Sequence, residues 1–373
     1  PFLQASVALF LVLKYRVHQR NLSIRMGQFF VKGCAKIGEN CILRPYKWKP
    51  MSLKRICGIF LSVGLLAGCG NDDGIDVEIV PPRDLAEVEA ENDADLREYM
   101  QTHFYNYEDF RNPPADFDYK IVLDTIAGEN AGKIPLIDQV TARQITVTNE
   151  ELGLEDQPDQ IHTLYYLNAR EGADVSPTVA DSAYVTYRGS LLDGRDFDGS
   201  FTQPTWFDLG RIQGPLQGAR GFAEAMPFFK AAEIITVNPD GTVSSLDGGV
   251  GLMLMPSGLG YFNAPPSTAI PAYSPLIFSI ELFSVEEADH DGDGIRSIDE
   301  DLDGDGSLYN DNTDEETERE IPGAPLRANF LDPDDDGDFT PTREEIIFNA
   351  DGTITFPDSN GNGIPDYLDP STS

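Results

Sequence analysis

The chain has 373 residues, of which 40% are hydrophobic, and a formal net charge of −36. The charge is uneven: residues 1–50 hold nine Lys and Arg against a single acid, whereas the chain from residue 69 onward holds 16 Lys and Arg against 62 Asp and Glu. Such an acidic surface repels nucleic acids and anionic headgroups and attracts cations. The composition therefore argues against nucleic-acid binding, and the length permits one or two globular domains with extensions.

Residues 1–50 are predicted not to belong to the mature protein. This segment begins with Pro1 and not with Met, and its basic composition matches nothing that follows. We interpret it as an upstream translation artefact or a discarded leader.

Residues 51–68 have the pattern of an export signal. Lys54 and Arg55 supply the positive start, and the apolar run 56–66 is too short to span a bilayer. The run ends in Leu66-Ala67-Gly68-Cys69, which resembles the lipobox of bacterial lipoproteins. In that family the cut falls before the Cys, whose sulfur is lipidated.

The resemblance implies a membrane anchor at Cys69 and a place in the cell envelope, on the outer membrane or the cell surface. The alternative is a hydrophobic helix followed by a chance cysteine.

No cysteine follows Cys69, so neither a disulfide framework nor a thiolate metal site is expected in the mature part. Residues 69–83 are predicted to be a tether. Its acidic start, Asn71-Asp72-Asp73, resembles the surface-export signal of Bacteroidetes lipoproteins. A solvated acidic tether without such a signal is an equal alternative.

Residues 84–159 are predicted to form an N-terminal extension, a helix followed by short strands. Asp84 is a suitable N-cap because Glu87 follows three positions later. Apolar residues then recur at near-helical spacing: Leu85, Val88, Leu96, Tyr99 and Phe104. The β-like runs 119–123 and 144–147 extend the next domain or form a small β unit against it.

Residues 160–285 have the pattern of an α+β domain. Strands are predicted over 162–167 and 183–190, and again over 276–282, where alternate apolar residues indicate a half-buried antiparallel strand. A short helix is predicted over 221–229 between them. Several strands wrapped around one short helix are an arrangement of the α+β class.

Six ordered segments within residues 160–285 resemble the FKBP family of peptidyl-prolyl isomerases. These are Tyr187-Arg188-Gly189, Asp193 to Asp198, Phe207 to Gly210, Gly221 to Met226, Met255-Pro256 to Gly260-Tyr261, and Ile270-Pro271 with Leu276 to Leu282. Any one match alone is weak, but their shared order is specific. The resemblance implies a twisted antiparallel sheet wrapped around a short helix, with an aromatic cavity between the two.

The resemblance also assigns the residues of a site that binds proline. The cavity residues are Tyr187, Phe197, Phe207, Phe222, Tyr261, Ile270 and Phe278, with Asp198 as the polar group at the rim and Ala219 at a main-chain donor position. The hydroxyl of Tyr261 would bond a substrate carbonyl. At the donor position the family has Val-Ile, whereas this chain has Gly218-Ala219-Arg220, so the loop is altered. A long insertion, 231–251, with a turn at Asn238 to Gly241, is predicted to form a hairpin.

The implied activity is isomerisation of X-Pro bonds in exported polypeptides. The barrier of about 20 kcal/mol arises because a twisted amide loses its resonance, so an enzyme needs no nucleophile, metal or other cofactor. A dry aromatic slot destabilises the planar, charge-separated amide. Two alternatives remain: the aromatic residues are simply core, or the domain is a non-catalytic peptide-binding or chaperone module.

Residues 286–373 form a predicted calcium-binding tail. Aspartates at alternate positions, followed by Gly and then by an acid at position 12, fit the EF-hand loop pattern. The candidate ligands are Asp289, Asp291, Asp293, the Ile295 carbonyl, Ser297 and Glu300; Asp334, Asp336, Asp338 and Glu345; and Asp358, Asn360, Asn362 and Asp369. A further loop, 301–312, is interpreted as degraded because Asn312 takes position 12.

The tail lacks the long helices that flank EF-hands, and it resembles the compact Asp-rich repeats of thrombospondin-type stalks. We expect structural Ca²⁺ in an otherwise irregular segment. The alternatives are a disordered acidic tail and a calcium-stiffened stalk on which the isomerase fold is only an adaptor.

Overall fold

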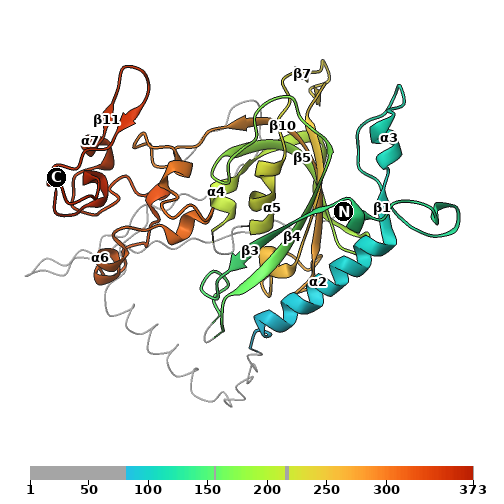
Figure 1. The fold of residues 1–373 in the computed structure, drawn as a ribbon, viewed down its shortest axis with the longest axis horizontal. Helices are drawn as coiled ribbons and strands as arrows, with labels where there is room; N and C mark the ends of the chain where they lie inside the picture. Colours follow the sequence, from blue (N-terminus) through green and yellow to red (C-terminus); the bar gives the residue numbers. More distant parts are fainter. Residues whose placement is uncertain (1–80, 155–156, 215–217, 373) are drawn as a thin grey trace, which may run out of the picture. The chain divides into compact units, whose positions relative to one another are not determined.

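A computed structural model describes residues 81–154, 157–214 and 218–372 (Figure 1). The predicted leader, the signal peptide, Cys69 and nearly all of the tether lie outside these residues. Among the described helices, none combines the length and the apolar character needed to cross a membrane.

An antiparallel sheet of six strands organises the described chain, in the order β3-β4-β9-β10-β5-β6. The strands are β3 (Thr141–Val147), β4 (Gln160–Arg170), β9 (Gly249–Met255), β10 (Leu276–Glu286), β5 (Ser182–Ser190) and β6 (Asp196–Asp208). The strands predicted over 162–167, 183–190 and 276–282 are confirmed within β4, β5 and β10. The run 144–147 is part of β3, so the predicted extension contributes an edge strand to this sheet.

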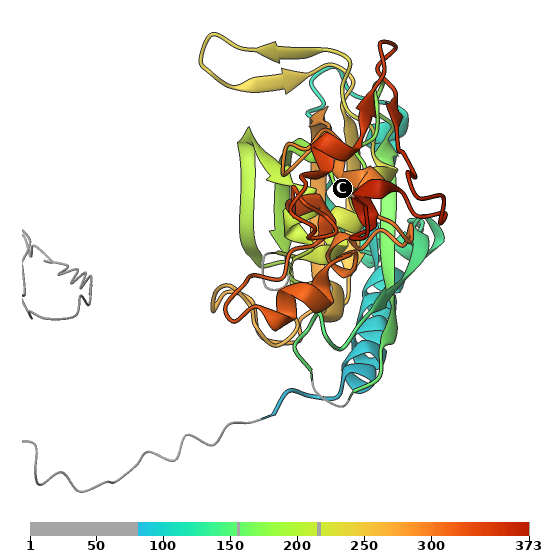
Figure 2. The same ribbon diagram turned by 90° about the vertical axis from the view of Figure 1, so that its left-hand side faces the viewer.

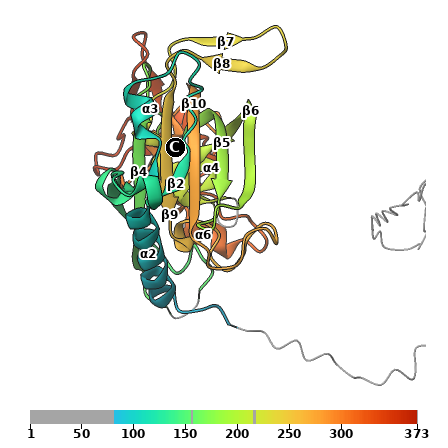
Figure 3. The same ribbon diagram turned by 90° about the vertical axis from the view of Figure 1, so that its right-hand side faces the viewer.

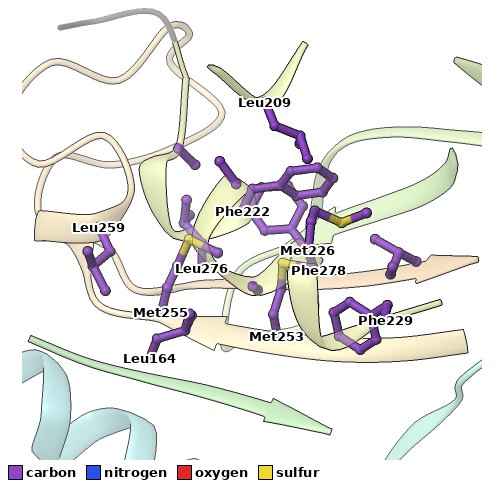
Figure 4. Close-up of a cluster of buried hydrophobic side chains, with 14 of the residues drawn as sticks. Leu164, Leu209, Phe222, Met226, Phe229, Met253, Met255, Leu259, Leu276 and Phe278 are labelled. Carbon is purple, nitrogen blue, oxygen red and sulfur yellow. The ribbon is translucent and has the colours of Figure 1, made fainter. Parts of the chain in front are cut away.

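Both faces of the middle of the sheet are covered, as strand β9 shows, because it is buried at every position. Successive side chains of a strand point to opposite faces. Met253 and Met255 accordingly join one apolar cluster, and Leu252 and Leu254 join another. The first cluster includes Phe222, Ala223 and Ala225 of helix α5 (Arg220–Ala225) (Figure 4), and the second includes residues of helix α2 (Leu85–Thr102) (Figure 3). This mixture of helices and antiparallel sheet agrees with the predicted α+β class.

Strand β10 differs from its prediction as a half-buried strand. Phe278 and Ile280 face the first cluster as expected, but Ile277 and Phe283 on the other face are each only 2% exposed. Ile277 packs in the cluster that α2 helps to form. The alternation within the strand could not reveal this cover, because it comes from a segment distant in sequence.

Helix α2 begins as predicted. The Asp84 carboxylate accepts a hydrogen bond from the Glu87 N–H at 2.9 Å, which satisfies a free donor of the first turn. Its buried face is tied to the sheet domain by polar contacts as well. The Tyr165 hydroxyl donates to Asp93 at 2.6 Å, and the Ser257 N–H donates to Asn92 at 2.7 Å.

The remaining elements before the tail are short. They are β1 (His103–Tyr105) paired with β2 (Leu123–Thr125), α3 (Tyr107–Arg111), α4 (Leu209–Ile212), the hairpin of β7 (Ile235–Val237) and β8 (Val243–Ser245), and single turns at Gly128–Asn130, Leu136–Asp138, Met226–Phe228 and Ser257–Leu259. The hairpin confirms the prediction for the long insertion, and it projects away from the sheet (Figure 2). The strand predicted over 119–123 forms only at its last residue.

The tail folds into successive loops with short helical turns. Its elements are α6 (Glu315–Glu320), α7 (Thr342–Glu345), β11 (Ile347–Phe348) paired with β12 (Ile354–Thr355), and single turns at Ser297–Glu300, Leu308–Asn310, Asn329–Leu331 and Asp366–Leu368. Two small apolar clusters hold it. One joins Leu308 and Phe330 to Ala180, and the other joins Ile295, Ile346 and Tyr367. The tail therefore has packed interiors of its own.

A buried histidine generates a prediction about the pH dependence of stability. His162 in β4 is fully buried, and its Nε2 has no hydrogen-bond partner among the described residues. A Cβ on Gly258 would lie 2.1 Å from that nitrogen, so only glycine fits there. Burial lowers the pKa of His162 from 6.5 to about 4.

We expect the His162 contribution to stability to be complete above pH 6.5 and to be lost as the pH falls toward 4. Between these two pH values His162 is protonated in the unfolded chain but neutral in the folded chain, which lowers the free energy of unfolding by up to about 3 kcal/mol. Denaturant unfolding of the wild type and of His162→Asn between pH 7 and 4.5 checks this, because carboxylates titrate alike in both chains. Parallel pH profiles for the two chains would contradict it.

Candidate functional site

Five aromatic side chains from four elements form a continuous series of ring contacts. Phe222 of α5 lies 5.1 Å from Phe207 of β6 and 5.5 Å from Phe278 of β10, measured between ring centroids. Phe207 in turn lies 5.0 Å from Tyr187, and Phe278 lies 5.5 Å from Phe197. Their steep or tilted ring angles are the favoured geometry for aromatic pairs. The structure thus brings together five of the residues that the sequence assigns to one cavity.

Burial within this series is graded. Phe222 and Phe278 are each 4% exposed and belong to the core that Figure 4 shows. Tyr187, Phe197 and Phe207 are only partly buried and pack against that core. The cluster therefore has a buried floor, formed by Phe222 and Phe278, and three partly exposed walls.

The two further apolar residues assigned to the cavity belong to the same core. Ile270 is 4% exposed, and Tyr261 is partly buried and packs against this core. Ala219, at the predicted donor position, is the N-cap residue of α5 and is also buried. All three are thus grouped with the aromatic series.

One glycine explains how closely the wall packs. A Cβ on Gly189 of β5 would lie 2.6 Å from the ring of Phe197 and 3.0 Å from that of Phe278. Both rings therefore pack directly on the main chain of β5. This contact gives a physical reason for the glycine in the segment Tyr187-Arg188-Gly189.

The rim of the cluster carries hydroxyl groups and one carboxylate. The Tyr187 hydroxyl donates to Asp198 Oδ2 at 2.8 Å, which fixes the orientation of both groups. Burial raises the pKa of Tyr187, and this hydrogen bond adds to the effect. Burial and the charge of Asp198 also raise the pKa of Tyr261. The raised pKa keeps the Tyr261 hydroxyl protonated. This hydroxyl donates no hydrogen bond to another described residue.

Arg220 occupies the altered loop at the start of α5 and makes a network that sequence reasoning missed. Its guanidinium donates to Glu151 at 2.8 Å, to Glu224 at 3.0 Å and to the Thr146 carbonyl at 3.2 Å. Glu224 is 2% exposed, and its burial raises its pKa while Arg220 opposes the shift. The Arg220–Glu224 spacing is visible in the sequence, but Glu151 comes from the distant extension.

Two cavities lie near the sheet, and they differ in position. A small one of about 50 Å³ is lined by Tyr261, Gly218 and Arg220 and by none of the five aromatic residues of the series. A larger one of about 450 Å³ is lined by Tyr187 of the series together with Thr186 and Ser279, but by none of the four phenylalanines. It lies on the outward face of β5 and β10, so its size does not identify it with the aromatic site.

The acidic loops of the tail share one backbone conformation. At position 6 the backbone is left-handed in all four loops, with φ of 105° at Gly294, 87° at Gly306, 77° at Phe339 and 94° at Gly363. In three of them the N–H of this residue donates to the first carboxylate of its loop, Asp301, Asp334 or Asp358. Phe339 thus adopts the glycine conformation that the loop requires.

The alternate aspartates converge as the loop pattern predicts. Carboxylate oxygens lie within 4.8 Å of one another in each of three groups: Asp289, Asp291 and Asp293; Asp301, Asp303 and Asp305; and Asp334, Asp336 and Asp338. Ligands of this kind, all oxygen, suit Ca²⁺.

Buried carboxylates without partners show that these residues fit a cation. Glu300 is 1% exposed and Glu345 is 7% exposed, and no described residue hydrogen-bonds any of their four carboxylate oxygens. Burial and neighbouring aspartates raise the pKa of Glu300 to about 10 and that of Glu345 to about 8. A buried, unpaired carboxylate is unfavourable, and a bound cation would remove that cost.

Other predicted ligands are engaged within the protein. The Ser297 hydroxyl lies 2.7 Å from His290 Nδ1 and accepts from the His290 N–H. Asp369 accepts hydrogen bonds from the side-chain amides of Asn360 and Asn362 at 2.8 and 2.7 Å. The last loop is therefore closed by amide–carboxylate contacts.

Sequence reasoning missed several acidic residues. Loop 301–312 was expected to be degraded, but Asp311 is 7% exposed, and burial and the charges of Asp303 and Asp301 raise its pKa to about 7. Asp311, at position 11 of the loop, thus lies near the loop aspartates in place of an acid at position 12. Another group joins Asp314, Glu318 and Asp332. No loop pattern places these three together, because two of them lie outside any Asp-x-Asp run.

Comparison with known proteins gives a partial match. No family model matches the chain. The FKBP-type peptidyl-prolyl cis-trans isomerase FkpA of Escherichia coli K12 is 29% identical over 128 residues, which are 34% of this chain and 38% of that protein. FkpA of Escherichia coli O157:H7 matches equally. The match thus spans well under half of the relative's length.

Similar solved structures also cover a third of the chain. A peptidyl-prolyl cis-trans isomerase from Pseudomonas syringae pv. tomato DC3000 has 25% identity and a TM-score of 0.26, over 33% of this chain and 76% of that one. The crystal structure of Escherichia coli FkpA has 28% identity and a TM-score of 0.25, over 33% and 48%. The sequence match relates about a third of the chain, distantly, to the FKBP-type isomerases.

The left-handed Phe339 generates a prediction about the third loop. Its side chain is 93% exposed and contributes no packing, whereas a left-handed non-glycine residue costs about 1–2 kcal/mol. We expect Phe339→Gly to raise the free energy of unfolding of the tail by up to about 1 kcal/mol, because glycine also gains freedom in the unfolded chain. Denaturant unfolding measures this.

The matched variant is Gly363→Ala, where an added Cβ meets no atom within 4 Å and only the backbone strain is introduced. It should shift stability in the opposite direction. Stabilisation by both variants, or by neither, would be evidence against the shared loop conformation.

Proposed function

We propose that the chain is a peptidyl-prolyl isomerase that acts on X-Pro bonds of exported polypeptides, and that the aromatic cluster is its proline pocket. The observation that carries this proposal is the graded series from Tyr187 to Phe197, with two buried rings as its floor and three partly exposed rings as its walls. The distant relationship to FKBP-type isomerases supports it.

The proposed chemistry needs only binding and orientation. A prolyl ring lies against the floor formed by Phe222 and Phe278, where its amide loses water. Desolvation disfavours the planar, charge-separated amide more than the twisted one, and the barrier of about 20 kcal/mol falls. Tyr261 donates to a substrate carbonyl, and the Ala219 main chain is the second donor. Such contacts accelerate the reaction to the extent that they are stronger in the twisted state.

We further propose that Cys69 is lipidated and holds the protein in the cell envelope, and that the tail binds structural Ca²⁺ through its acidic loops. The buried carboxylates of Glu300 and Glu345 support the calcium part. Ca²⁺ supplies positive charge there, and the chain's own carboxylates set its position.

The altered loop supports a second candidate function, peptide binding without turnover. The Arg220 network with Glu151 and Glu224 replaces the apolar loop of the resembled family. A rigid, charged rim can hold a peptide without easing rotation of its bond.

An isomerase assay on the full chain separates the two functions. We expect the wild type to accelerate cis–trans exchange of a proline peptide, and Tyr261→Phe to lower kcat/KM about 3- to 10-fold, the value of one neutral hydrogen bond. Phe197→Leu should also lower it, because the wall is reshaped at similar volume. Tyr184→Phe is the matched control, since Tyr184 stacks on Trp206 away from the cluster.

If Tyr261→Phe and Phe197→Leu both fold and keep full activity, the aromatic cluster is not the catalytic site. A wild type that binds the peptide but does not accelerate exchange would establish the second candidate.

Calorimetric titration with Ca²⁺ tests the calcium part of the proposal. Binding heat and a higher unfolding midpoint are expected for the full chain, because the ions neutralise carboxylates that repel one another. The absence of both effects would show that the acidic loops do not hold Ca²⁺.

A further inference from the structure

Asp335 is a buried acid that the loop pattern does not use. It stands between Asp334 and Asp336, the first two alternate ligands of the third loop, at a position that the pattern leaves out. The structure nevertheless buries it to 1% exposure. Neither of its carboxylate oxygens accepts a hydrogen bond of ordinary geometry from a described residue; the adjacent Thr342 hydroxyl accepts from the Asp335 main-chain N–H at 3.1 Å. Its burial therefore needs a different partner.

The Asp335 carboxylate points to the first loop and not to its own. Its oxygen lies within 4.8 Å of carboxylate oxygens of Asp291 and Glu300. Glu300 is likewise 1% exposed with two unpartnered oxygens, and Asp291 has one. Carboxylate oxygens of three residues from two loops thus meet at one buried position.

No positive side chain compensates this charge. Within the described residues, no Lys, Arg or His forms an ion pair with Asp291, Glu300 or Asp335. Arg343, which lies nearby, donates to the carbonyls of Gly292 and Asp293 at 3.3 and 3.5 Å. A cluster of buried like charges is strongly unfavourable unless a cation joins it.

We propose that one divalent cation is held jointly by Asp291 and Glu300 of the first loop and by Asp335 of the third. The inference rests on the proposed calcium-binding role of the tail and deepens it by naming a ligand from a second loop. An all-carboxylate donor set favours Ca²⁺ over metals that prefer nitrogen or sulfur. Both ring nitrogens of His290 are already engaged, by Ser297 and Asp208.

The shared ion adds to contacts that already join the first loop to the third, such as the hydrogen bonds from Arg343 to the Gly292 and Asp293 carbonyls. The apolar cluster of Ile295, Ile346 and Tyr367 lies at the same junction. The first loop is also bound to the sheet domain, because His290 Nε2 lies 2.9 Å from Asp208 Oδ1. A filled site therefore links the third loop, through the first, to the sheet domain.

Asp335→Asn in the full chain tests the shared site, because its shift in unfolding temperature relative to the wild type should have opposite signs with and without Ca²⁺. In chelator, the variant should unfold at a higher temperature than the wild type, because asparagine removes a carboxyl group that is costly to bury, either as a charge or through the proton that it must take up. In saturating Ca²⁺ it should unfold at a lower temperature, and its affinity for one Ca²⁺ should fall on the order of tenfold or more, since a ligand charge is lost. Glu344→Gln is the matched control, an exposed acid in the same loop that should change neither value.

Terbium luminescence gives a second measurement that does not depend on stability. Tyr367 belongs to the same apolar cluster as Ile295 of the first loop, which places it near the proposed ion. Tyr367→Phe should reduce the tyrosine-sensitised emission of Tb³⁺, and Asp335→Asn should weaken Tb³⁺ binding in parallel with Ca²⁺ binding.

The outcomes separate the two proposals. If the wild type responds to Ca²⁺ but Asp335→Asn binds it with unchanged affinity, the shared site is wrong and the calcium tail stands. If the wild type does not bind Ca²⁺ or Tb³⁺ at all, both fall. A shift of Asp335→Asn in the same direction with and without Ca²⁺ would identify Asp335 as a structural acid only.

Discussion

The contact between Phe222 of α5 and Phe278 of β10 is the constraint on which the site depends. It holds the short helix against the middle of the sheet, with ring centroids 5.5 Å apart. The backbone must approach closely for this to occur: a Cβ on Gly221 would lie 2.9 Å from Met255 Sδ. Phe207 and Phe197 then pack on the two rings from either side. Enlarging or shrinking either ring would move the walls as well as the floor.

The tail and the aromatic cluster meet at the same short segment. Asp208, the residue after Phe207, caps α4 by accepting from the Arg211 N–H at 3.0 Å, and it also contacts His290 of the first acidic loop. Gln213, just after α4, accepts from the Leu308 N–H of the second loop. Packing of the tail therefore restrains residues 208–213, which follow one wall of the cluster.

Local rules predicted the parts of this protein that depend on neighbours in sequence. The Asp84 cap, the alternation in β5 and the hairpin at Asn238 to Gly241 follow from capping, strand period and turn chemistry. The converging loop aspartates follow from their spacing. Contacts between distant segments could not be predicted in this way. Glu151 reaches Arg220 from the extension, and Asp335 reaches the first loop from the third, and no local pattern marks either partner.

The most direct test of the account is where a proline peptide binds. Chemical-shift mapping of the full chain with an X-Pro peptide distinguishes the aromatic cluster from the larger cavity on the outward face. The account predicts that the Ile270 methyl signals shift on binding and that the prolyl ring protons move upfield, as expected for a ring that lies against aromatic faces. Shifts confined to Val243 and Thr186, which line the outward cavity, would contradict it.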